Sequence, residues 1–126
     1  MDKDELVHEI GTMLLEDEDI QSSGAWKHLA MVVQFMTGTT KVNGFVYLSN
    51  GESVPAAPDN FDVIKKFREL REAMKEPGKE QWKAALVRID DASKRISIDF
   101  EYDHPERWLI VPSTVKQMAE TLRPAE

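Results

Sequence analysis

Apolar and polar residues alternate from Lys94 to Asp103, a stretch that reads KRISIDFEYD. Successive side chains of a β-strand point to opposite faces, so this pattern predicts a strand with one apolar face. The apolar positions are Ile96, Ile98, Phe100 and Tyr102, and the polar positions are Ser97, Asp99, Glu101 and Asp103. Like charges on one face of a strand repel each other, so the row of three acids indicates a role other than folding.

Helical periodicity marks three other segments. The first is Lys3–Glu16, the second follows a cap at Asp59 or Asn60 and ends at Pro77-Gly78, and the third begins near Thr114. Thr114 and Gln117 have the spacing of a capping box. Apolar residues recur every three or four positions in each segment, which predicts an amphipathic helix. These residues are Leu6, Val7, Ile10, Met13 and Leu14; Val63, Ile64, Phe67, Leu70 and Met74; and Val115, Met118 and Leu122.

The remaining apolar runs predict strands. Two of them, Trp26–Met36 and Val42–Ser49, are joined by a Thr-Gly turn and form an expected hairpin, although a buried helix is an alternative for the first. Trp82–Ile89 and the alternating stretch form a second expected hairpin through the turn at 90–93. We expect an extended connector at 54–58, and a short fifth strand or an extended tail at Trp108–Val111.

The order of elements is therefore α-β-β-α-β-β-(β)-α. It predicts an α+β fold with two β-hairpins in one antiparallel or mixed sheet, packed with three helices. The chain of 126 residues is expected to form a single domain over residues 1–126, which is large enough to bury a core without disulfides or a structural metal.

Composition excludes several classes of function. The chain has no cysteine, so disulfides, thiolate metal sites and cysteine nucleophiles are excluded. Its first residues, MDKDELVHEIG, lack the basic and apolar regions of a signal peptide. No apolar run approaches the roughly 18 residues that a membrane span requires. We expect a cytoplasmic protein that does not contact a membrane.

The net charge of −7 is concentrated at one end of the chain, because residues 1–24 hold eight acids and one base. Nucleic-acid-binding proteins gather Lys and Arg on one surface, so this distribution argues against direct binding to nucleic acid. It suits a partner with a basic surface, although an acidic end that only aids solubility is an alternative. Within this end, Glu16, Asp17, Glu18 and Asp19 follow a helix, where the helix dipole disfavours acids. That position makes the cluster a candidate binding site.

The sequence offers little chemistry. His8, His28 and His104 are isolated and lack metal-ligand spacing, and no phosphate-binding or nucleophile motif is present. We therefore expect no metal, no cofactor and no catalytic residue. The alternative is a small hydrolase that uses Asp103, His104 and Glu106 as acid and base groups.

Several features together resemble the YezG-like immunity proteins of bacterial polymorphic toxin systems. These are the charged helix written FxxIKKFRELREAM, the Pro77, Gly78 and Trp82 turn, the hairpin that ends IDFEYD, and the nearby Trp108. The family's usual glycine in the last hairpin turn is replaced here by Ala92-Ser93-Lys94. The resemblance implies a non-enzymatic antidote that binds and neutralises a cognate toxin domain, often a nuclease. Such antidotes also accompany contact-dependent growth inhibition toxins.

The charge pattern and the resemblance agree on an acidic protein that covers a basic toxin surface. The expected toxin-binding residues are Glu16, Asp17, Glu18, Asp19, Asp99, Glu101 and Asp103, and we expect them to lie together on one side of the fold. Tyr47 or Trp26 is the expected apolar anchor. We expect a monomer rather than a dimer. A small adaptor or secretion chaperone for an effector is the main alternative function.

Overall fold

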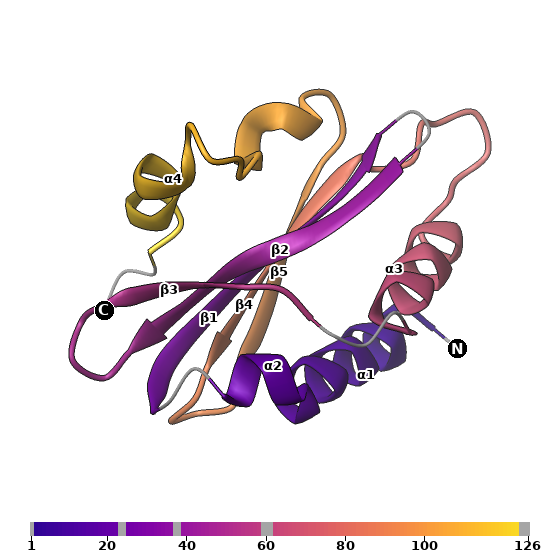
Figure 1. Cartoon of the computed structure of the whole chain (residues 1–126). Helices are drawn as coiled ribbons and strands as arrows, with labels where there is room; N and C mark the ends of the chain where they lie inside the picture. Colours follow the sequence, from indigo (N-terminus) through magenta and orange to yellow (C-terminus); the bar gives the residue numbers. More distant parts are fainter. Residues whose placement is uncertain (1, 23–24, 37–38, 59–61, 124–126) are drawn as a thin grey trace.

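The computed structural model describes residues 2–22, 25–36, 39–58 and 62–123, and every structural statement below concerns these residues. A five-stranded sheet carries helices α1, α2 and α3 on one face and helices η1 and α4 on the other (Figure 1). The helices are α1 (Lys3–Glu16), α2 (Glu18–Gln21), α3 (Asp62–Ala73), the 3-10 helix η1 (Pro105–Trp108) and α4 (Val115–Thr121). The strands are β1 (Trp26–Met36), β2 (Thr39–Leu48), β3 (Ser53–Ala56), β4 (Ala84–Asp90) and β5 (Ile96–Glu101).

The sheet is antiparallel throughout, in the order β3-β2-β1-β4-β5. Strands β1 and β2 form one hairpin and β4 and β5 form the other, so the predicted α+β class and both predicted hairpins are confirmed. Helix α3 connects edge strand β3 to β4, which pairs with β1 in the middle of the sheet. Strand β5 is consequently the other edge.

The fifth strand is not where the sequence pattern suggested it. Strand β3 (Ser53–Ala56), which overlaps the connector expected at 54–58, pairs with Gly44–Tyr47 of β2. The expected strand or tail at Trp108–Val111 instead begins as the end of η1, which starts at Pro105. A proline in the first turn of a helix lacks only an N–H that would have no intrahelical partner, so this position favours the 3-10 turn.

Strand β1 is apolar from Leu29 to Val33, where both of its faces are buried. Leu29, Met31 and Val33 join the core beneath α1 and α3, whereas Ala30 and Val32 join a second core beneath η1 and α4. A strand buried on both faces reads as a continuous apolar run rather than an alternating one. This explains why the sequence pattern left a helix as an alternative for this segment.

Two details at element ends differ from expectation. Tyr102, expected on the apolar face, lies beyond the end of β5 and is 42% exposed. Thr114 does not cap α4 through its side chain; its hydroxyl donates to the Leu109 carbonyl and accepts from the Val111 N–H instead. The expected caps Asp59 and Asn60 lie outside the described residues.

We call η1, α4 and the residues between them the C-terminal cover. Side chains of the sheet hold this cover in place by donating hydrogen bonds to its backbone carbonyls. Gln34 Nε2 donates to the Pro105 carbonyl at 2.8 Å, and Lys41 Nζ donates to the Ile110 carbonyl at 2.7 Å. The hydroxyl of Tyr47 donates to the Ala119 carbonyl in α4, also at 2.7 Å. The cover is therefore attached by polar bonds as well as by the apolar contacts of Trp108, Ile110 and Met118.

We expect Tyr47→Phe to lower the free energy of unfolding by about 1 kcal/mol, the usual cost of losing one buried hydrogen bond. The substitution keeps the ring in the core and removes only the bond to Ala119. Urea-induced unfolding measures the change. Tyr102→Phe is the matched control, because this exposed side chain contributes little to packing, and a loss of equal size in both variants would contradict the role assigned to Tyr47.

Candidate functional site

The two acidic clusters lie on opposite faces of the sheet, not on one shared side as expected. Glu16–Asp19 spans the junction of α1 and α2, which cover one face together with α3. In β5, Ile96 and Phe100 pack toward that same face, so Asp99 and Glu101 point to the opposite face. One partner surface does not reach both clusters without wrapping around the edge of the sheet.

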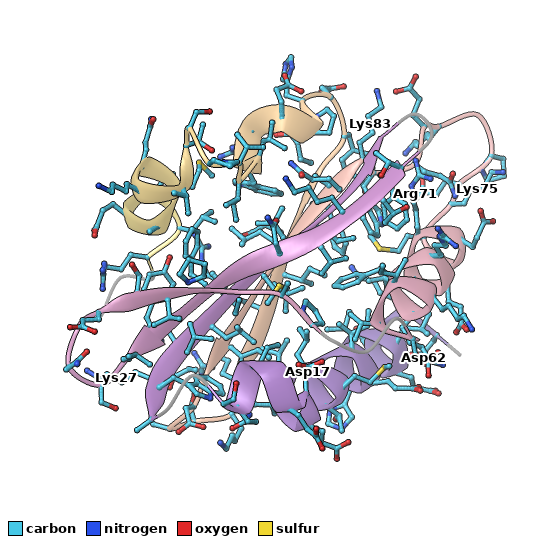
Figure 2. All side chains as sticks on the ribbon, viewed as in Figure 1. Asp17, Lys27, Asp62, Arg71, Lys75 and Lys83 are labelled. Carbon is cyan, nitrogen blue, oxygen red and sulfur yellow. The ribbon has the colours of Figure 1, made fainter. Side chains whose placement is uncertain are left out.

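The junction cluster has a structural explanation in part. The Asp17 side chain is 5% exposed and accepts a hydrogen bond from the Ile20 N–H at 3.2 Å, so it caps the start of α2. Acids that appeared to follow one helix therefore begin another, where an N-cap carboxylate is favourable. Figure 2 shows Asp17 at this junction. Asp17 is buried and is therefore not a docking residue. The side chain of Asp19 is not among those that the structure describes.

The acids of α1 and α2 form an exposed surface, which we call the α1 acidic surface and define as Glu5, Glu16 and Glu18. All three are exposed, and no cation of the described residues lies within ion-pair distance of them. Glu5 and Glu16 are eleven residues apart, close to three helical turns, so they project from the same side of α1. Between them, Glu9 pairs with Lys66 of α3 at 3.0 Å, and this hydrogen bond raises the pKa of Lys66.

Glu101 of β5 is committed to local structure. One carboxylate oxygen accepts from the N–H groups of Asp103 and His104, and the other lies 3.3 Å from the Arg107 guanidinium. The two backbone hydrogen bonds, helped by Arg107, lower the pKa of Glu101. Glu101 thus stabilises the turn between β5 and η1.

The other two acids of this row are exposed. Asp99 lies 3.4 Å from Arg88 of β4, with 63% of its side chain accessible. Arg88, Asp99 and Arg107 line a cavity of about 340 Å³ beside Trp108. Asp103 lies exposed beyond the end of β5. Two arginines therefore offset the acids of β5, and this face is not the uniformly negative surface that the sequence suggested.

The residues expected as apolar anchors are buried. Tyr47 is 2% exposed and Trp26 is 6% exposed, so neither presents an aromatic ring to a partner. Tyr102 is the large exposed aromatic residue of the described chain. The sequence did not reveal this exposure, because Tyr102 continues the apolar alternation of Ile96, Ile98 and Phe100 and the pattern does not show where the strand ends.

The residues of the alternative catalytic group lie at the surface of the protein. Asp103, His104 and Glu106 are all exposed, and His104 Nδ1 lies 3.4 Å from Glu106 Oε1. Two larger hollows lie at the end of the sheet where β1 begins; they have volumes of about 500 and 510 Å³ and share Lys27, His28 and Ser49. None of these three acid and base groups lines either hollow.

Neither a metal cluster nor a membrane span was found in the described part of the chain. No three His, Asp or Glu side chains there are placed to hold a metal ion. No described helix is long and apolar enough to cross a membrane.

Comparison with known proteins found no family model and no curated protein that matches this chain. The resemblance to YezG-like immunity proteins stays a hypothesis that rests on the residues quoted for it.

We expect Glu101→Gln to lower the midpoint temperature of unfolding at neutral pH. The folded state lowers the pKa of Glu101, so the ionised group stabilises the fold above the ordinary carboxyl pKa of about 4.3. That stabilisation is lost as pH falls through the lower pKa of the folded state. The difference between wild type and variant should therefore shrink as the pH falls from neutral to below the ordinary carboxyl pKa.

Thermal unfolding monitored by circular dichroism across this pH range measures the difference. Asp103→Asn is the control, since it removes a neighbouring carboxylate that is exposed. A difference between wild type and Glu101→Gln that does not change with pH would show that the hydrogen bonds of Glu101 do not depend on its charge.

Proposed function

We propose that this protein is a non-enzymatic immunity protein that binds and neutralises a bacterial toxin domain in the cytoplasm. The observation that carries the proposal is the α1 acidic surface, where three exposed carboxylates have no cationic partner among the described residues. Isolated like charges on one surface favour association with a partner of opposite charge and speed its encounter. Each chain is proposed to bind one toxin domain, without a metal or cofactor.

The proposed partner is a toxin that acts on nucleic acid. Such a toxin needs a cationic surface for its substrate, and an acidic protein that covers this surface excludes the substrate electrostatically and sterically. The charge distribution supports this choice, because eight acids and one base among residues 1–24 together equal the net charge of −7 of the whole chain. The same distribution argues against direct binding of this protein to nucleic acid.

Apolar contacts next to the acids would supply affinity. Charged groups at the rim of an interface mainly raise the association rate, whereas apolar groups in its centre slow dissociation. Met13 of α1 is only partly buried and lies three residues before Glu16, about 60° from it around the helix. We propose that Met13 takes the anchoring role that Tyr47 and Trp26, being buried, do not fill.

The direct test combines this protein with the toxin encoded beside its gene. We expect a complex at micromolar concentration, loss of the toxin's activity, and survival of cells that express both proteins. Full toxin activity in the presence of excess protein, with no complex by size-exclusion chromatography, would overturn the proposal. A complex that leaves the toxin active would favour the adaptor or chaperone function, since only an immunity protein protects a susceptible cell.

Charge reversal tests which surface binds. We expect the double variant Glu16→Lys and Glu18→Lys to bind the toxin about tenfold more slowly at low salt, with a smaller difference at high salt, where charges are screened. Stopped-flow measurements at two salt concentrations determine the rates. The substitutions lie in exposed positions and leave the Asp17 cap intact.

The matched control is Glu76→Lys with Glu80→Lys, which changes the net charge equally at exposed positions beyond the end of α3. These two acids take part only in exposed ion pairs with Lys79 and Lys83, which contribute little to stability. If both double variants slow binding to the same extent, net charge rather than the α1 acidic surface governs the encounter.

A further inference from the structure

Strand β5 has an open edge. The Arg95 and Glu101 carbonyls accept hydrogen bonds from β4 and its preceding residue, so the backbone groups of 95, 97, 99 and 101 face β4. Alternate residues of an antiparallel strand point their N–H and C=O groups in opposite directions. The N–H and C=O groups of Ile96, Ile98 and Phe100 therefore face away from the sheet, and no described residue bonds to them.

This edge lacks the features that usually prevent strands from pairing. The opposite edge, β3, is four residues long and contains Pro55, which has no N–H to donate. Strand β5 has six residues, no proline and no covering segment that bonds to it among the described residues. An edge of this kind is a template for a further antiparallel strand.

The charges along β5 identify the strand that fits. Arg95 precedes the strand and is exposed, with no acidic partner for its guanidinium among the described residues. Asp99 and Glu101 lie at the other end, on the same face as Arg95. An antiparallel copy of this strand brings the basic start of each strand to the acidic end of the other.

We propose that two copies of this protein pair through β5 about a two-fold axis at Ile98. In this register Ile98 lies opposite Ile98 of the second copy, and Ile96 lies opposite Phe100, so all three outward-facing residues form hydrogen-bonded pairs. Arg95 lies opposite Glu101 of the second copy and diagonal to Asp99, within reach of its long side chain. Shifting the register by two residues toward the acidic end would place Asp99 opposite Asp99, which is unfavourable.

The pairing makes one continuous ten-stranded sheet from two five-stranded ones. It departs from the sequence-based expectation of a monomer, because the pattern of residues does not reveal which strand lies at an edge. A single strand pair is a small interface, so we expect reversible association. The proposal is independent of toxin binding. Gly11 of α1 packs on Ile96 of β5, whereas Glu5 and Glu16 project about 120° and about 140° away from Gly11 around the helix.

The first experiment measures association of the protein alone. Sedimentation equilibrium between about 1 µM and about 1 mM is expected to give a monomer–dimer equilibrium. Hydrogen exchange is compared at the two ends of this range. We expect it to slow with rising protein concentration at the amides of Ile96, Ile98 and Phe100, but not at the amides of the other edge strand, β3. A monomer at every concentration would overturn the proposal, and so would a dimer that leaves these three amides unprotected.

The second experiment exchanges charges across the interface. Arg95→Glu alone and Asp99→Lys alone each place like charges together in the dimer and are expected to raise its dissociation constant about tenfold. The double variant restores opposite charges between position 95 and position 99 of the second copy, but leaves the new glutamate at 95 opposite Glu101, so it is expected to regain only part of the affinity. If either residue only stabilised the fold of its own chain, the double variant would have a higher dimer dissociation constant than either single variant.

Lys75→Glu is the control for a change of net charge. Lys75 is exposed and lies just beyond the end of α3, at the upper right of the view in Figure 2, and its substitution is expected to leave the dissociation constant unchanged. Equal weakening by Lys75→Glu and Arg95→Glu would contradict the proposed register. If the wild type stays monomeric at every concentration and the charge variants lose toxin protection, the edge belongs to the toxin instead and self-pairing is wrong.

Discussion

The fold depends on burying both faces of β1. Every residue from Leu29 to Gln34 is inaccessible to solvent, so the strand needs a cover on each side. Helices α1, α2 and α3 supply one cover with an apolar core. The other cover is short and is fastened partly by side chains of the sheet, including Gln34 itself, which donates to the Pro105 carbonyl. A strand that carries two covers leaves the edges of the sheet, rather than its faces, open to partners.

Periodicity predicted the local elements well, because the spacing of apolar residues reflects which side of each element is buried. Both hairpins and the amphipathic helices Lys3–Glu16 and Asp62–Ala73 follow from it. Periodicity does not determine strand order, so the pairing of Ser53–Ala56 with β2 and the edge position of β5 were not predictable. It also placed Tyr102 in the core, since alternation continues past the end of the strand.

The candidate site was predicted only in part, because a carboxylate has several possible uses. Asp17 caps α2 and Glu101 holds the turn before η1, and both tasks were invisible in the sequence. The concentration of acids in the first helix was visible, and Glu5 and Glu16 are exposed there. What the sequence could not give was the separation of the two acidic clusters, since this depends on which face of the sheet α1 covers.

Self-pairing through β5 and toxin binding through α1 are compatible, and their combination has a consequence for affinity. The two-fold axis would place both α1 helices on the same side of the ten-stranded sheet, because directly opposite residues of paired strands share a face. Two α1 acidic surfaces would then face the same direction. A basic surface that contacts both would bind more tightly than to one chain, since the second contact is intramolecular. A toxin domain that contacts only one surface would gain no such advantage, so the concentration dependence of inhibition would report whether the paired or the single chain is the active form.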